Sequence, residues 1–223
     1  MSRTRVALSW SSGKDSAWTL HRLRQDPGIE VVALVTTVNE AFNRVAMHAV
    51  RQELLRAQVE AAGLPLIEVP IPYPCSNADY ESRMRALIER LRGERVERMA
   101  FGDLYLEDVR AYREKQLQGT GIAPVFPLWN EPTAALARTM IAGGLRAVLT
   151  CVDPKRLAPE FCGRPFDAAL LDALPEGVDP CGENGEFHSF ACAGPMFRAP
   201  IAVETGETVE RDGFVFTDLR VVR

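Results

Sequence analysis

The chain has 223 residues, of which 47% are hydrophobic and 25% are charged, and its net charge is −4. These values are typical of a globular protein with a substantial core, and they disfavour a basic nucleic-acid-binding surface. Because no apolar run approaches the roughly 18 residues that span a bilayer and no secretory signal opens the chain, we expect a cytoplasmic monomer or homodimer without nucleic-acid or membrane partners.

Strand and helix patterns alternate through the first 130 residues. Short apolar runs predict strands at residues 5–10, 30–38, 66–69, 96–102 and 123–128, the third of them broken by Pro70. Amphipathic patterns predict helices at residues 16–25, 47–62, 77–92 and 106–117. Such alternation indicates an α/β fold, a doubly wound parallel five-stranded sheet with its ligand crevice at the carboxyl ends of the strands.

The pattern changes near residue 130. A helix is predicted at residues 133–142 and a strand at 147–152, followed by an irregular stretch from 153 to 195. Two last strands, 201–209 and 214–222, are joined by a tight turn and predict a hairpin. We therefore divide the chain into a first domain, residues 1–130, and a smaller α+β domain, residues 131–223.

The five cysteines are an odd number and include no C-x-x-C pair. In a reducing compartment we expect them to be free thiols. The spacings of Cys151, Cys162, Cys181 and Cys192 do not match paired zinc ligands, so a zinc site is disfavoured.

The residues between the first predicted strand and helix, 9–16, read Ser-Trp-Ser-Ser-Gly-Lys-Asp-Ser and are called here the 9–16 loop. Backbone N–H groups beside a helix N-terminus favour an anion, and Gly13 lets the backbone approach it. Lys14 supplies a positive charge, and Asp15 beside a triphosphate suggests an intervening Mg²⁺. The spacing is not that of a Walker motif. A polar turn in which a serine caps the helix is the alternative.

Residues 11–16 resemble the S-G-G-x-D-S loop of the PP-loop ATP pyrophosphatases, whose fold is of the adenine nucleotide alpha-hydrolase, Rossmann-like type. Those enzymes cut ATP between the α and β phosphates and leave an adenylated substrate. Ser12 stands where the family usually has the first glycine of its pair, and we expect it to keep the turn with a negative φ. The resemblance implies ATP and Mg²⁺ as cofactors, with Asp15 toward the metal.

Three further segments resemble one branch, the diphthine–ammonia ligase family. They are Phe101-Gly102-Asp103 followed by Glu107, the P-x-x-P-L-W-like residues 124–129, and the G-E-[GN]-G-E-[FY]-like residues 182–188, called here the 182–188 loop. In eukaryotes and archaea this family amidates diphthine, a modified histidine of elongation factor 2, with ATP and ammonium. The resemblance implies a ligase that adenylates a small-molecule or protein carboxylate and passes it to ammonia or an amine, releasing AMP and pyrophosphate.

These motifs assign a role to each candidate site residue. The expected nucleotide-binding residues are Ser9, Ser11, Ser12, Gly13, Lys14, Asp15, Ser16, Val35 and Gly102. The expected substrate residues are His48, Asp103, Glu107, Glu183, Asn184 and Glu186. Lys14 and Asp15 are expected to act in catalysis, with Glu186 or His188 as the general base.

Three other functions would share the 9–16 loop. A sulfur-transfer enzyme acting on RNA, or a related adenylyl sulfate reductase, would be expected to have paired cysteines or a C-terminal cysteine in its own motif. A nucleotide-sensing module would bind ATP without turnover, and Asp15, Asp103 and the 182–188 loop are the features against it.

Overall fold

The computed structural model describes residues 3–39, 44–45 and 50–222. Its first sheet contains five parallel strands in the spatial order β4-β2-β1-β5-β6. A two-residue strand, β3, pairs antiparallel with the end of β2. The strands are β1 (Thr4–Ser9), β2 (Ile29–Asn39), β3 (Arg44–Val45), β4 (Leu66–Ile71), β5 (Arg98–Ala100) and β6 (Ala123–Val125). The doubly wound parallel sheet is confirmed.

Helices cover both faces of this sheet, because its strands are apolar on both sides. On β1, Val6 and Leu8 belong to one core cluster while Ala7 belongs to another, as strand alternation requires. The first cluster also contains residues of α1 (Lys14–Gln25) and α2 (Gln52–Ala62). The second contains residues of α3 (Asn77–Gly93) and α4 (Glu107–Leu117).

A second sheet, antiparallel throughout, has the strand order β8-β7-β10-β9. Its strands are β7 (Arg146–Val152), β8 (Phe187–Ala193), β9 (Val203–Arg211) and β10 (Phe214–Val221). The predicted hairpin is confirmed, and its turn residues Asp212 and Gly213 have φ of 53° and 80°, as in a type I′ turn. The connections include α5 (Thr133–Ala142), a 3₁₀ turn (Pro159–Phe161) and α6 (Ala168–Ala173).

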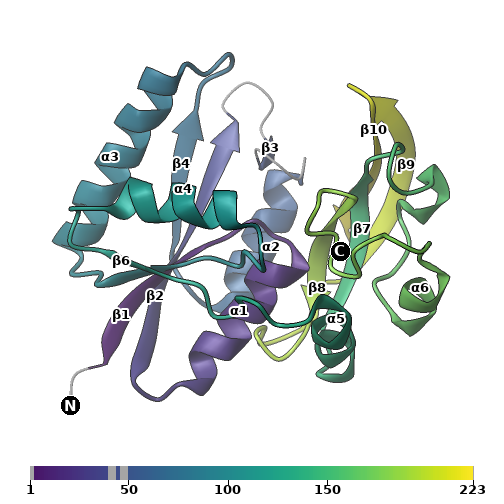
Figure 1. Ribbon diagram of the computed structural model, residues 1–223, viewed down its shortest axis with the longest axis horizontal. Helices are drawn as coiled ribbons and strands as arrows, with labels where there is room; N and C mark the ends of the chain where they lie inside the picture. The colour runs from purple at the N-terminus through teal and green to yellow at the C-terminus, as the bar shows by residue number, and fades with distance from the viewer. Residues whose placement is uncertain (1–2, 40–43, 46–49, 223) are drawn as a thin grey trace.

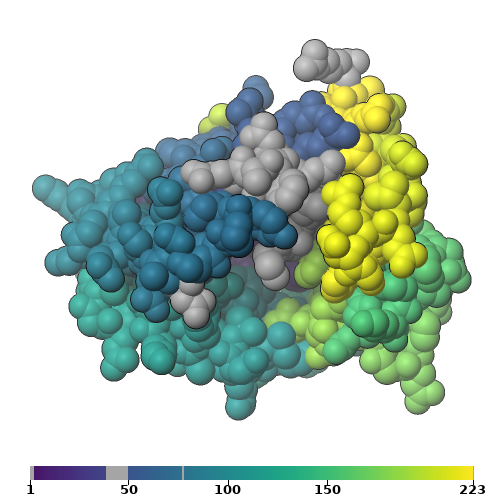
Figure 2. Space-filling view, turned by 90° about the horizontal axis from the view of Figure 1, so that it is seen from above, coloured from purple at the N-terminus to yellow at the C-terminus, as the bar shows by residue number. Residues whose placement is uncertain are grey.

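The helices α1 and α2 lie between the two sheets (Figure 1). One core cluster runs from the first sheet through these helices to Phe187 and Phe190 of β8 and Leu219 of β10. Seen from above, the blue and teal elements of the first sheet stand on one side and the yellow C-terminal strands on the other (Figure 2). The division of the chain at residue 130 remains our proposal, because the two parts share this core.

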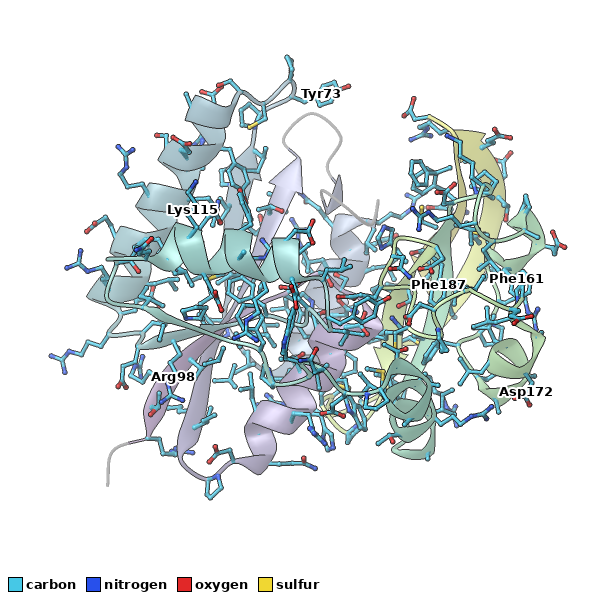
Figure 3. The ribbon with its side chains drawn as sticks, in the orientation of Figure 1. Tyr73, Arg98, Lys115, Phe161, Asp172 and Phe187 are labelled. Carbon is cyan, nitrogen blue, oxygen red and sulfur yellow. The ribbon has the colours of Figure 1, made fainter. Side chains whose placement is uncertain are left out.

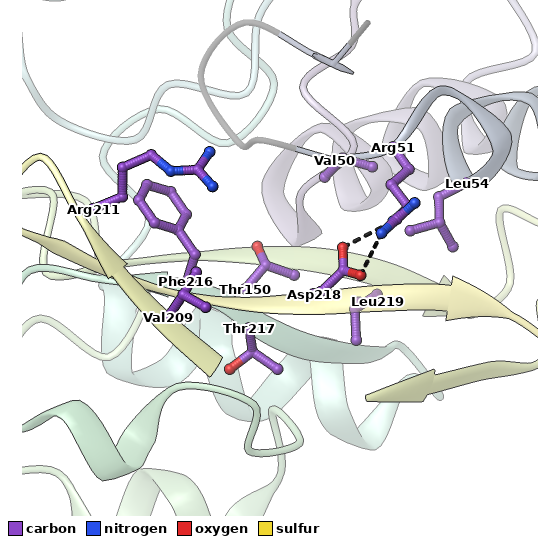
Figure 4. Close-up of a pocket in the computed structure, with 10 residues that line it drawn as sticks. All are labelled: Val50, Arg51, Leu54, Thr150, Val209, Arg211, Phe216, Thr217, Asp218 and Leu219. Atoms are coloured by element: carbon purple, nitrogen blue, oxygen red, sulfur yellow. Dashed lines mark hydrogen bonds and ion pairs between the residues drawn. The ribbon is translucent and has the colours of Figure 1, made fainter. Parts of the chain in front are cut away.

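Arg51 and Asp218 tie the two parts together at one edge. Arg51 precedes α2 and donates to both carboxylate oxygens of Asp218 on β10, at 2.8 and 2.6 Å (Figure 4). A small cavity of about 70 Å³ lies beside this pair. None of the described helices is long and apolar enough to cross a membrane.

Three predictions of secondary structure need correction. The strand β8 lies within the stretch predicted to be irregular, because Phe187–Ala193 pairs with β7, which is distant in sequence. Pro70 lies inside β4 and does not end it; β4 pairs only with β2 among the described strands, so a residue without an N–H is tolerated on its free edge. The second helix begins at Gln52 within the described chain, five residues later than predicted.

Candidate active site

A cavity of about 540 Å³ opens at the carboxyl ends of β1, β2 and β5. Because β1 lies between β2 and β5, the 9–16 loop stands where the strand order reverses, the usual ligand site of such sheets. The helices α3 and α4 form one wall, and the 182–188 loop closes the side toward the second sheet. The volume is in the range of small-molecule sites.

Most of the predicted site residues line this cavity. Those that do are Ser9, Ser11, Gly13, Lys14, Asp15, Ser16, Val35, Gly102, Asp103, Glu183 and His188. Those in the described chain that do not are Ser12, Glu107, Asn184 and Glu186. His48 lies outside the described residues. Glu107 is exposed at the start of α4, so its predicted contact with substrate or Mg²⁺ is not supported.

The start of α1 presents its backbone to the cavity. The residue at the cap position of the helix is Gly13, which has no side chain, so no serine occupies that position. The serine-capped turn that we considered is therefore wrong. The Ser11 hydroxyl accepts from the N–H of Gly13 at 3.3 Å and lies 3.1 Å from the hydroxyl of Ser16. Ser189 of β8 accepts the N–H of Lys14 at 3.3 Å.

Ser12 contradicts the expectation of a negative φ. Its φ is 69°, the left-handed conformation of a glycine, which costs a non-glycine residue roughly 1–3 kcal/mol. The residue is fully buried, and its hydroxyl has no hydrogen-bond partner. Its carbonyl accepts from the N–H of Ala191 on β8 at 3.0 Å. Ser12 thus adopts a backbone conformation that favours glycine and anchors the 9–16 loop to the second sheet.

Gln58 of α2 supports the loop from behind and was missed from the sequence. Its side-chain amide donates to the carbonyls of Ser12 at 2.9 Å and Ala191 at 2.7 Å, and its oxygen accepts from the indole N–H of Trp10 at 3.0 Å. The residue is fully buried. The available signal was its place between Leu54 and Ala62 on the apolar face of a helix, where a polar side chain requires partners.

Lys14 does not extend freely toward the cavity. Its ammonium group donates to Asp15 at 2.8 Å and to the carbonyl of Cys181, and it lies 5.6 and 5.4 Å from the ring centroids of Phe166 and Phe187. Phe187 is labelled in Figure 3 where the second sheet meets the first. Burial lowers the pKa of Lys14, but the attraction of Asp15, Cys181 and Glu183 together with the hydrogen bond to Asp15 outweighs burial, and the pKa stays above its ordinary value. Lys14 therefore links the 9–16 loop to the second sheet and orients Asp15.

Gly102 allows the strand end to pack closely on the 9–16 loop. A Cβ at this position would lie 3.1 Å from the carbonyl carbon of Asp15 and 3.1 Å from the nitrogen of Ser16. The close approach that requires glycine is therefore to the loop backbone. Its contact with a nucleotide stays a prediction.

Two more carboxylates face the cavity beside Asp15. Glu183 accepts the N–H of Leu104 at 2.7 Å, and burial together with the charge of Asp15 raises its pKa to about 7. Burial also raises the pKa of Asp103, although the guanidinium of Arg113, 3.6 Å away, opposes that rise. Within the described ranges, no group of three or more His, Cys, Asp or Glu side chains is arranged to hold a metal ion.

Asp179 shapes the 182–188 loop from within. Its carboxylate accepts the N–H groups of Cys181 at 2.8 Å and Glu183 at 3.2 Å. Glu186 is buried and accepts from the N–H of Asp179 at 3.1 Å and from the side chain of Asn184 at 3.0 Å. The predicted role of Glu186 as general base is thus not supported, because its carboxylate holds the loop together behind the cavity wall.

His188 keeps a position from which it could accept a proton. It lines the cavity on β8, and burial and the charge of Lys14 lower its pKa, so the imidazole is neutral at neutral pH. Of the two predicted general bases, His188 lines the cavity and Glu186 does not, while Glu183, predicted to contact the substrate, is a further proton acceptor in the cavity wall.

Comparison with known proteins covers nearly the whole chain. Residues 4–124 match the Diphthamide synthase N-terminal domain, and residues 132–220 match the Diphthamide synthase C-terminal domain. The diphthine–ammonia ligase of Bos taurus is 26% identical over 98% of this chain and 90% of that protein. The diphthine–ammonia ligase of Homo sapiens is 25% identical over the same shares.

A solved structure is also similar. The U34-tRNA thiolase NcsA from Methanococcus maripaludis with its [4Fe-4S] cluster has a TM-score of 0.41 and 17% sequence identity. The similarity covers 63% of this chain and 57% of that one.

Proposed function

The chain belongs to the diphthamide synthase family, and from this premise we propose that it is an ATP-dependent ligase. It adenylates a carboxylate and passes the acyl group to ammonia or another amine. The acceptor that the family relationship favours is the diphthine carboxylate of elongation factor 2. One observation carries the proposal: the 9–16 loop and the 182–188 loop, which are far apart in the sequence, line the same cavity.

The cavity suits a nucleotide in its division into polar and apolar parts. The polar part is the start of α1, whose backbone N–H groups and dipole favour phosphates. The apolar part lies over β2 and α3 and includes Val35, Met84 and Ile88, which suit the adenine ring. ATP therefore enters with its phosphates over the 9–16 loop and its base toward β2.

Mg²⁺ fits this site as a partner of the phosphates. Asp15 is the acidic side chain of the 9–16 loop, lines the cavity and keeps 25% of its side chain exposed beside Lys14. Mg²⁺ is usually held by one or two carboxylates together with substrate phosphates and waters, so three protein ligands are not required. Asp15 would hold the ion, which when bound neutralises charge on the leaving pyrophosphate.

The chemistry then needs positioning and acceptance of two protons, one from ammonium before it attacks and one from the nitrogen afterwards. A carboxylate oxygen of the acceptor attacks the α-phosphorus, the bond to the bridging β-phosphate oxygen breaks, and pyrophosphate leaves. Ammonia attacks the acyl carbon, the bond from that carbon to the AMP oxygen breaks, and the nitrogen loses a proton. Ammonium must also be deprotonated before it attacks. Glu183, with a pKa of about 7, and His188 are the bases in reach of the cavity.

The rival functions are less well supported. Cys181 belongs to the cavity wall, but its thiol donates toward the carbonyl of Thr133 and burial raises its pKa far above the ordinary value. A buried thiol of this kind is a poor nucleophile, which disfavours sulfur transfer. A sensing module would not require three carboxylates beside the phosphate site.

The test is to measure AMP, pyrophosphate and amide with elongation factor 2 carrying diphthine, ATP and ammonium. We expect AMP and amide in equal amounts, and no AMP when the acceptor already carries the amide. AMP release that is indifferent to the acceptor, or formation of ADP, would contradict the proposal.

A further inference from the structure

The inner face of α4 carries a cation that no predicted motif contains. Val109, Arg113 and Gln116 recur at helical spacing and line the cavity, whereas Lys115 is exposed on the outer face (Figure 3). Arg113 packs its guanidinium over the ring of Phe101, 5.0 Å from the ring centroid. Its side chain is 29% exposed, so it is partly open to the cavity.

Arg113 is the cation of the cavity that has hydrogen-bonding capacity to spare. The other lining cation, Lys14, is already engaged by Asp15 and by the carbonyl of Cys181. Arg113 lies 3.6 Å from Asp103, which is longer than a hydrogen bond, and its buried Nε has no hydrogen-bond partner. The contact with Asp103 engages one nitrogen of the guanidinium, and the other N–H donors of this partly exposed side chain are available to a ligand in the cavity.

The charge around it explains why a carboxylate substrate would need this residue. Asp15, Asp103 and Glu183 line the same cavity and repel an incoming anion. The acceptor must nevertheless bring a carboxylate oxygen to the α-phosphorus. A guanidinium binds a carboxylate through two parallel N–H donors, which offsets the repulsion and also fixes the plane of the carboxylate.

The order of the strands separates this residue from the base of the nucleotide. Val35 of β2 and the 9–16 loop after β1 would hold the adenine and the phosphates. Phe101, whose ring contacts the guanidinium of Arg113, follows β5 on the opposite side of β1. We propose that Arg113 binds the carboxylate of the acceptor and aligns it with the α-phosphorus, an assignment that rests on the proposed function.

The test compares Arg113→Met and Arg113→Lys with Arg110→Met. Methionine keeps the packing on Phe101 without charge, and lysine keeps the charge beside Asp103 without the planar fork. Arg110 lies on the same helix but pairs with Glu114 at 2.8 Å and does not line the cavity, so it is the matched control. Two quantities are measured: KM for the diphthine-bearing acceptor in AMP release, and Kd for a non-hydrolysable ATP analogue.

We expect Arg113→Met to raise the acceptor KM by about 10- to 100-fold, with Arg113→Lys between it and the wild type. The Kd of the ATP analogue should stay within about threefold, and Arg110→Met should change neither quantity. An equal loss of ATP-analogue affinity would overturn the assignment in favour of a phosphate contact, and an unchanged acceptor KM would overturn it outright.

Failure of the proposed function gives a different result. If the wild-type enzyme releases no AMP in the presence of the diphthine-bearing acceptor, a panel of small carboxylic acids is tested for stimulation of AMP release. A carboxylate that stimulates the wild type and Arg113→Met equally shows that only this inference is wrong. If no carboxylate stimulates the wild type, the proposed function and the inference are both wrong.

Discussion

Glu183 and Glu186 belong to the same short loop but differ in position. Glu183 faces the cavity and accepts the N–H of Leu104, whereas Glu186 is buried and accepts from Asp179 and Asn184. The first can bind or deprotonate a substrate, and the second holds the backbone of the loop in place. The difference arises from Asp179, whose carboxylate fixes the turn that decides which side chain points inward.

The raised pKa of Glu183 predicts a dependence of stability on pH. The folded-state pKa, about 7, lies above the ordinary value of 4.5, so between these values the folded protein holds a proton that the unfolded chain has released. The contribution of Glu183 to stability therefore falls as the pH rises through this window and is constant above it. Relative to Glu183→Gln, the wild type should lose about 1–2 kcal/mol of unfolding free energy as the pH rises through this window; this figure is discounted for partial exposure of the side chain.

Urea unfolding of both proteins from about pH 4 to pH 8 measures this difference. Near pH 4 both side chains are neutral, so the low-pH end of each series serves as the internal control. A difference in unfolding free energy that stays flat, or that grows in favour of the wild type as the pH rises, would show that Glu183 is not desolvated as described. Glu183→Gln should also lower amide formation, as expected for a base of the reaction.

At this scale the sequence predicted which residues gather at the site better than what each one does. The 9–16 loop and the acids of the 182–188 loop were identifiable from their residue types and from their resemblance to family motifs. The φ of Ser12 and the engagement of Lys14 were not, because both depend on contacts with β8 and the carbonyl of Cys181. Arg113 belongs to none of the sequence motifs and was not predicted, because its place at the cavity depends on which face of α4 turns inward.

Among the secondary-structure elements, α2 and β8 together hold the 9–16 loop. On β8, the backbone N–H of Ala191 donates to the carbonyl of Ser12, and the side-chain hydroxyl of Ser189 accepts from the N–H of Lys14. Gln58 of α2 joins the same carbonyl to Ala191 and to Trp10. A loop with a left-handed serine is thereby fixed from two elements that are distant in sequence.

Replacing Gln58 should therefore loosen the loop as well as destabilise the protein. Gln58→Leu removes one hydrogen-bond partner from each of three buried groups: the indole N–H of Trp10 and the carbonyls of Ser12 and Ala191. We expect a loss of about 2–4 kcal/mol in unfolding free energy, and an ATP-analogue Kd at least several-fold higher under folded conditions.

The matched control for this change is Gln52→Leu, at the start of the same helix, where the side chain accepts from Arg56 at 3.3 Å at an exposed position. Urea unfolding and calorimetric titration measure both variants. If Gln58→Leu lost stability but bound the ATP analogue like the wild type, its hydrogen bonds would serve the core alone and not the loop.

The elements themselves were predictable where the signal is local. Periodicity and flanking glycines and prolines identified β1, α1, β2 and α3 within a few residues. The strand β8 was missed because Phe187–Ala193 mixes histidine and serine with apolar residues. In addition, the 34 residues 153–186 separate it from its partner β7. Strand pairing over such a separation leaves no local pattern.

In the whole molecule, two sheets enclose α1 and α2, and the cavity opens where the first sheet meets the second (Figure 1). In the proposed function, the nucleotide side is built from the early part of the chain, and the acceptor side uses the 182–188 loop. Lys14 and Ser12 connect the two sides through Cys181 and Ala191. This arrangement supports a reaction in which the nucleotide and the acceptor carboxylate meet in one enclosed site.

The most direct test of this account is to follow oxygen from the acceptor into AMP. With ¹⁸O in the acceptor carboxylate, attack on the α-phosphorus and later cleavage at the acyl carbon leave one labelled oxygen on the phosphate of AMP. We predict one ¹⁸O per AMP by mass spectrometry, with none in pyrophosphate. Unlabelled AMP, or label in inorganic phosphate, would contradict adenylation of the carboxylate.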